Sequence, residues 1–102
     1  MNDPKVLGDR VREARAVRSR RSDKQFTQKM LAVKIGETEK WVRKLERGEF
    51  YPDWDSLSLL ADTCGVDMDF LLGENIDRKV YHEAIQGGRV AQTIDVEELM
   101  EH

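Results

Sequence analysis

Four cationic side chains recur at helical spacing within the stretch TEKWVRKLERGEFYPDW, residues 38–54. They share one face of a helix over residues 39–46 because they follow the i, i+3, i+4, i+7 pattern: Lys40, Arg43, Lys44 and Arg47. Val42 and Leu45 lie on the opposite face, where they can anchor the helix to a core. A cationic helix about two turns long fits the major groove of B-DNA, where Lys and Arg can donate to guanine and to phosphates.

The same four cations could instead form a face that only contacts water, because basic faces are common on surface helices. Trp41 lies on the border between the two faces, so its ring can pack on Leu45 or approach whatever the cationic face meets. Glu39 is the acid of this helix. Near DNA it would be costly unless it accepted a hydrogen bond from cytosine N4, and otherwise it stabilises the positive N-terminus of its own helix.

Charge is divided unevenly along the 102 residues, whose formal net charge is −3. Residues 1–50 carry 14 Lys and Arg against 8 Asp and Glu, a balance of +6. Residues 51–102 carry 3 against 12, a balance of −9. A polyanion would therefore be attracted to the first half and repelled by the second. The length suits one domain with a modest core.

Composition favours a soluble cytoplasmic protein that is not an enzyme. Hydrophobic residues are 39% and charged residues 36%, no apolar run approaches the ~20 residues that span a bilayer, and the N-terminus lacks the core of a signal peptide. The single cysteine, Cys64, excludes an internal disulfide framework. His82 and His102 have no spaced partner for zinc. With no catalytic constellation or phosphate-binding glycine loop, we expect no cofactor and no metal.

Capping residues and glycines divide residues 3–73 into five expected helices. Asp3 and Pro4 open the first, which we expect to fade near Arg18 in the polar run RSRRSDKQ. Each later helix begins at a capping side chain and stops at a glycine: Thr27 to Gly36, Thr38 to Gly48, Asp53 to Gly65 and Asp67 to Gly73. The very short turn between the second and third helices requires a steep crossing angle.

The tail from Glu74 carries mixed patterns. Residues 77–86, DRKVYHEAIQ, can form a helix that Gly87 and Gly88 would break. Residues 89–96 alternate weakly, as in an edge strand, and residues 95–102 could equally form a final helical turn.

Residues 27–48, TQKMLAVKIGETEKWVRKLERG, resemble the phage repressor and Cro-type (XRE-like) helix-turn-helix family. The family pattern is met by Thr27, Gln28, Leu31, Ala32, Ile35, Gly36, Thr38, Val42, Leu45, Glu46 and Gly48. The family's fourth helix is resembled by Pro52, Leu57, Leu60, Ala61, Gly65 and Val66. The resemblance covers residues 6–73. It implies an all-α, compact five-helix lambda-repressor-like DNA-binding domain over residues 1–73, followed by a short C-terminal extension over residues 74–102.

The resemblance also implies that the third helix enters the major groove, and it assigns roles by position. Gln28 would hold a phosphate, and Thr38 would touch the DNA backbone or a base. Glu39, Lys40 and Lys44 would read bases, with Trp41 at the border of this set. Arg43 and Arg47 would support them at phosphates. Arg15 would pair with Glu46 as a structural ion pair.

The chain departs from the family pattern in three places. The connection between the first two helices is longer than usual, and its Arg18, Arg20 and Arg21 either add phosphate contacts or are simply solvated. Trp41 replaces what is often a small residue, so the third helix would sit less deeply in the groove. Cys64 stands where the family usually has leucine, which suggests a buried, inert thiol.

These features predict a transcriptional repressor, cytoplasmic and nucleoid-associated, that binds an inverted-repeat operator in double-stranded DNA as a homodimer. The dimer surface would be Leu59, off the core face of the fourth helix, the tail or the fifth helix. The tail could also fold back over its own domain. The tail's apolar residues are Tyr81, Ile85, Val90, Ile94 and Leu99. The alternative function is an antitoxin-like or adaptor protein whose acidic tail binds a partner protein.

Overall fold

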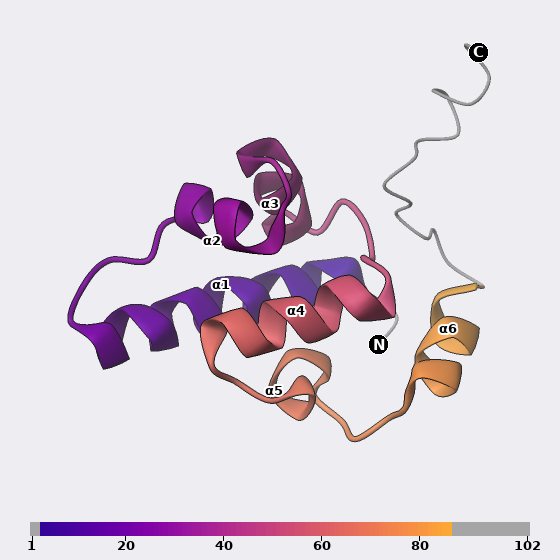
Figure 1. Cartoon of the computed structure of the whole chain (residues 1–102). Coiled ribbons are helices and arrows are strands. Elements are labelled where there is room, and N and C mark those ends of the chain that lie inside the picture. Colours follow the sequence, from indigo (N-terminus) through magenta and orange to yellow (C-terminus); the bar gives the residue numbers. More distant parts are fainter. Residues whose placement is uncertain (1–2, 87–102) are drawn as a thin grey trace, which may run out of the picture.

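The computed structural model describes residues 3–86, which form six α-helices and no strand within that range (Figure 1). The helices are α1 (Pro4–Ser22), α2 (Gln28–Ile35), α3 (Glu39–Glu46), α4 (Trp54–Cys64), α5 (Met68–Leu72) and α6 (Arg78–Gln86). The expected all-α fold is confirmed. The edge strand or final helical turn expected after residue 88 lies outside the described residues.

Local capping sets the ends of the short helices. The side chains of the four expected N-caps each accept a hydrogen bond from a backbone N–H of the first turn: Thr27, Thr38, Asp53 and Asp67. Three helices end at a glycine in the left-handed conformation, at Gly36, Gly65 and Gly73. These contacts reach only three or four residues along the chain, which is why the sequence predicts the bounds so closely.

The first helix is longer than the sequence indicated. Instead of fading near Arg18, α1 continues to Ser22 and ends at Asp23, which adopts the left-handed conformation at φ 56°. The extra turns are held by tertiary contacts, since Arg18 donates to the carbonyl of Thr63 and Arg21 to that of Gly65. Both carbonyls lie at the C-terminal end of α4, where backbone oxygens lack partners within the helix.

The expected placement of the three arginines in a connection between helices therefore needs correction. Arg18, Arg20 and Arg21 lie on α1 rather than in a loop. The guanidinium of Arg18 also stacks over the ring of Phe26, with its carbon 4.0 Å from the ring centroid. Arg18 and Arg21 are thus committed to packing α1 against α4, whereas Arg20 remains exposed.

The core lies between α1 and α4, with α2 and α3 on one side of this pair and α5 on the other (Figure 1). Its fully buried members include Leu31, Val42, Leu45, Leu57 and Leu60. Cys64 belongs to the same cluster, and its burial raises the pKa of the thiol to about 11. The expected burial of the Cys64 thiol is confirmed.

Gly8 lets α1 approach α3 closely. A Cβ placed on Gly8 would lie 2.5 Å from the carbonyl oxygen of Leu45 and 2.7 Å from that of Glu46. Such distances leave no room for a side chain, so glycine is required where α1 crosses the C-terminal end of α3.

The sixth helix covers one end of α4. Tyr81 is fully buried, donates a 2.6 Å hydrogen bond to the carbonyl of Pro52, and lies against the ring of Trp54 with centroids 5.7 Å apart. Ile85 is also buried, and Arg78 pairs with Asp55. Two arrangements are expected for the tail, a dimer contact or a segment folded back over its own domain, and the residues of α6 adopt the second. Tyr81 and Ile85 are therefore not exposed for a dimer contact, and Val90, Ile94 and Leu99 lie outside the described residues.

Candidate nucleic-acid interface

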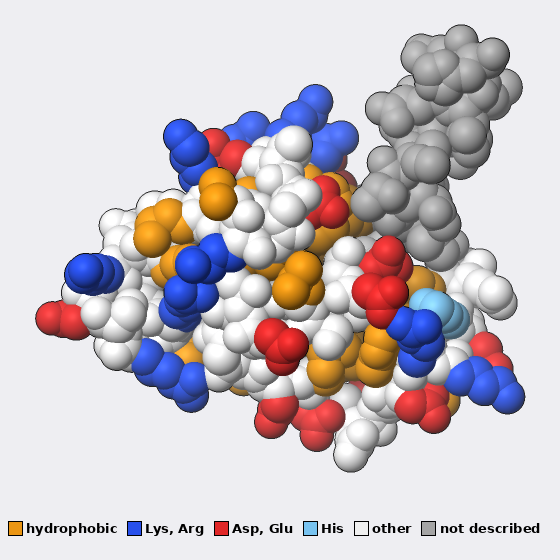
Figure 2. All heavy atoms as spheres, viewed as in Figure 1, with side chains coloured by type: hydrophobic (Ala, Val, Ile, Leu, Met, Phe, Trp, Pro, Cys, Tyr) orange, Lys and Arg blue, Asp and Glu red, His pale blue; other side chains and the backbone are white. Residues whose placement is uncertain are grey.

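The third helix is fixed to the core by one face and exposes the other. Thr38 begins it by accepting a 3.0 Å hydrogen bond from the backbone N–H of Trp41. Val42 and Leu45 are completely buried. The opposite face carries Lys40, Arg43 and Arg47 as exposed residues and Lys44 as a half-buried one. The apolar back and cationic front expected from the spacing are both present, and Figure 2 shows Lys and Arg side chains gathered over α3.

A three-residue turn joins α2 to α3. Gly36 ends α2 at φ 74°, and its N–H is directed back to the carbonyls of Ala32 and Val33. Thr38 then begins α3 two residues later. Packed together across this turn, α2 and α3 hold the cationic face of α3 in a fixed orientation relative to the rest of the domain.

Glu46 is the buried charge around which three helices meet. Its carboxylate accepts hydrogen bonds from Arg15 on α1, through Nε at 2.6 Å and Nη2 at 2.8 Å. The pair expected between Arg15 and Glu46 is confirmed. Arg12 also lies near, with Nη2 donating to the backbone oxygen of Glu46 at 3.3 Å. The Glu46 side chain is fully buried, so these hydrogen bonds offset the cost of its burial, and the bond to Glu46 raises the pKa of Arg15.

The sequence did not reveal that Gln28 joins this cluster. Its side-chain Nε2 donates to Glu46 Oε1 at 3.0 Å, and the residue is half-buried at the first position of α2. One amide hydrogen of Gln28 is therefore directed into the protein. The expected phosphate contact by Gln28 stays a prediction, to be made by its second amide hydrogen or by the N-terminus of α2.

Trp41 turns its ring towards the protein. The residue is half-buried, and its ring meets Phe50 edge-on with centroids 5.3 Å apart. Its indole Nε1 is buried and has no hydrogen-bond partner within residues 3–86. Of the two roles considered for Trp41, packing is the one this geometry favours, with Phe50 as a partner that the sequence did not indicate.

The remaining expected contact residues lie at the two ends of α3. Glu39 is exposed in the first turn, where a negative charge stabilises the helix N-terminus. Thr38 is exposed beside it. Arg47 caps the other end and pairs with Glu49, with Nε 2.8 Å from the carboxylate. This pair is exposed, so it contributes little stability and can be exchanged for a phosphate at small cost.

Comparison with protein families identifies the arrangement. The helix-turn-helix family model matches residues 17–71, which run from the second half of α1 to α5. The chain belongs to the phage repressor and Cro-type helix-turn-helix family. No curated protein and no solved structure matches it in the comparisons made.

Membership of the helix-turn-helix family makes the chain a DNA-binding transcriptional regulator. The family is not enzymatic, which confirms the expectation that the chain is not an enzyme. Within residues 3–86, no helix has both the length and the apolar character that crossing a bilayer requires.

Proposed function

We propose that this helix-turn-helix protein is a repressor that binds an inverted-repeat operator in double-stranded DNA as a homodimer, with α3 in the major groove. The observation that carries the proposal is the cationic outer face of α3, which stands on a completely buried Val42 and Leu45. A helix held in this way presents its charges without rearrangement. Occupying the operator would block polymerase sterically.

The roles along α3 follow the position of each residue in the family pattern. Glu39 and Lys40, which are exposed, and Lys44, which is half-buried, would read bases. Arg43 and Arg47, both exposed, would meet phosphates, with Arg47 at the end of the helix. Thr38 and Gln28 would meet the backbone at the starts of α3 and α2, and Trp41 would border the contact.

A homodimer would bring two α3 helices about 34 Å apart, onto successive major-groove faces of the operator. Leu59 on α4 and Val80 on α6 keep exposed fractions of 42% and 44%, and α4 and α6 pack together. We propose that the dimer contact includes Leu59. Its exposure accords with the expectation that Leu59 falls off the core face.

Selection of bound duplexes from random DNA tests the proposal directly. We expect recovery of one inverted repeat with half-sites about one helical turn apart. Lys44→Ala should cost roughly 1–3 kcal/mol on that operator and relax the preference at one base pair. Arg47→Ala should weaken binding to every sequence alike and lower the salt slope by about one. Lys79→Ala, an exposed lysine on α6, is the control.

Recovery of unrelated sequences, or wild-type affinity after Lys40 and Lys44 are both changed to alanine, would contradict the proposed role of α3. A single half-site without symmetry would leave DNA reading intact but reject the dimer.

A further inference from the structure

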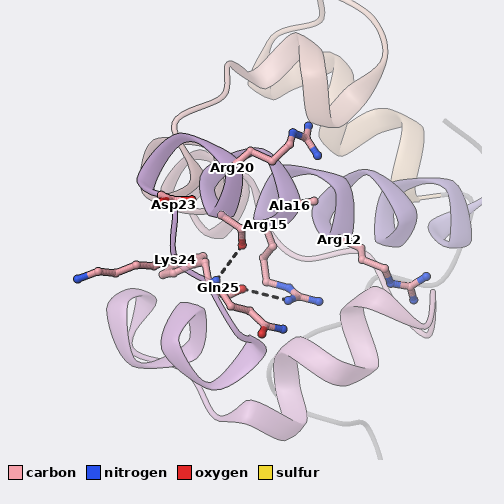
Figure 3. Close-up of a pocket in the computed structure, with 9 residues that line it drawn as sticks. Arg12, Arg15, Ala16, Arg20, Asp23, Lys24 and Gln25 are labelled. Carbon is pink, nitrogen blue, oxygen red and sulfur yellow. Dashed lines mark hydrogen bonds between the residues drawn. The ribbon is translucent and has the colours of Figure 1, made fainter.

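The arginines of α1 serve two different purposes. Four of them fix α1 to its neighbours, through hydrogen bonds to Phe70, Glu46, Thr63 and Gly65 that are made by Arg10, Arg15, Arg18 and Arg21. Arg12 and Arg20 lie on another face of α1. They flank a hollow of ≈ 550 Å³ between α1 and the connection to α2 (Figure 3).

The hollow is strongly basic. Four cations line it against the single acid Asp23: Arg12, Arg15, Arg20 and Lys24. The small side chains of Ala16 and Ser19 lie between the two outer arginines and leave the space open. The connection that forms the opposite wall is held in place, since Ser19 Oγ accepts a 2.8 Å hydrogen bond from the N–H of Phe26.

The donors around the hollow diverge instead of converging. Arg15 is occupied by Glu46 and by a 3.1 Å bond to the carbonyl of Phe26. The side chains of Arg20 and Lys24 have no hydrogen bond or ion pair within residues 3–86. Figure 3 shows Arg12, Arg20 and Lys24 directed away from one another. A small anion needs donors aimed at one point, whereas an extended polyanion is met by charges spread along it.

The hollow lies near the C-terminal end of α3. Arg12 reaches the backbone of Glu46, the last residue of α3, and its side chain is 54% exposed. Gln28, the first residue of α2, meets the same Glu46. Arg12 and Arg20 are eight residues apart, so they span about 12 Å along α1, a length over which one DNA strand places roughly three phosphates.

We infer that the rim formed by Arg12, Arg20 and Lys24 binds phosphates of the DNA strand flanking the half-site that α3 reads. This inference rests on the proposed function and extends it, because the last turns of α1 would lengthen the contact beyond the helix-turn-helix itself. The acids near this surface are Asp23, Asp9, which lies 3.8 Å from Arg12, and the buried Glu46, which lies 3.7 Å from Arg12 and pairs with Arg15. The four cations that line the hollow outnumber these three acids.

The test uses the full chain and two duplexes: the operator recovered by selection trimmed to its half-sites, and the same operator extended by about one helical turn on each side. Binding is measured as a function of salt concentration for four proteins. These are the wild type, the single variant Lys24→Gln, the double variant Arg20→Gln with Lys24→Gln, and the matched control Lys79→Gln. On the extended duplex the slope should fall by about 0.9 per lost contact, so the decrease in affinity between about 50 and 200 mM salt should be roughly 3-fold smaller for each lost contact. On the trimmed duplex the variants and wild type should agree.

Equal slopes for all proteins on the extended duplex would overturn the inference and leave the proposed function standing. Sub-millimolar binding of inorganic phosphate, lost in the double variant while DNA slopes stay unchanged, would also overturn it by assigning the hollow to a free anion. Failure of the wild type to prefer any duplex would overturn the proposed function together with this inference.

Discussion

Replacing Glu46 with glutamine removes the charge on which α1, α2 and α3 converge. The carboxylate accepts two bonds from Arg15, at 2.6 and 2.8 Å, and one from Gln28 at 3.0 Å. The Arg15 side chain is 17% exposed, so its charge would be left mostly out of water. Neutralising one partner of a buried pair costs about 3–5 kcal/mol. Because Arg15 keeps some hydration and its bond to Phe26, we expect a loss of about 3 kcal/mol.

Urea unfolding followed by circular dichroism measures this loss. Glu49→Gln is the matched control, because Glu49 pairs with Arg47 at 2.8 Å but its side chain is 42% exposed. Exposed pairs contribute about 0–1 kcal/mol, so the control should unfold at nearly the wild-type urea concentration.

A loss in Glu46→Gln no larger than that of Glu49→Gln would refute the reasoning that burial makes this pair indispensable. The double variant Arg15→Met with Glu46→Met gives an independent check. It should be more stable than Glu46→Met alone, because it leaves no unpaired buried charge. Strict additivity of the two single losses would show that the residues are not coupled.

Four further predictions concern the core. Tyr81→Phe should cost roughly 1 kcal/mol in urea unfolding, because the Pro52 carbonyl loses the 2.6 Å hydrogen bond that Tyr81 donates. Gly8→Ala should cost about 1–3 kcal/mol in the same assay, since its Cβ would lie 2.5 Å from the Leu45 carbonyl oxygen. Burial raises the pKa of Cys64 from 9.0 to about 11, so alkylation of the native protein at about pH 8 should be at least roughly 100-fold slower than in urea. By the same shift, the stability contributed by Cys64 is present below about pH 9 and is lost as the pH rises towards about 11, which unfolding at several alkaline pH values would show.

Features set by neighbouring residues could be predicted from the sequence. The bounds of α2 and α3 follow from Thr27, Thr38 and Gly36, because a cap is completed within one turn. The two faces of α3 follow from spacing alone. The Arg15 pair with Glu46 came from the family resemblance, since nothing in the spacing of two residues 31 positions apart could indicate it.

Features set by distant contacts could not be predicted in this way. The last turns of α1 contain few apolar residues, so their periodicity gave no signal for a helix. They are stabilised by Arg18 and Arg21, whose acceptors lie 45 and 44 residues further along the chain. In the tail, the apolar pattern around Tyr81 and Ile85 fitted a dimer contact as well as a folded-back helix. The acceptor at Pro52 and the ring of Trp54 decide between them.

The position of a residue in a family pattern does not fix the direction of its side chain, as Gln28 shows. Its amide shares the carboxylate of Glu46 with Arg15, so a residue at the start of α2 is tied to the buried pair. In Glu46→Gln the positive charge of Arg15 would no longer be neutralised beside the expected phosphate site. Stability should therefore fall while the affinity for non-specific duplex DNA at low salt is maintained or increased. Parallel losses of stability and of non-specific affinity would indicate that the phosphate contacts lie elsewhere, away from the junction of α1, α2 and α3.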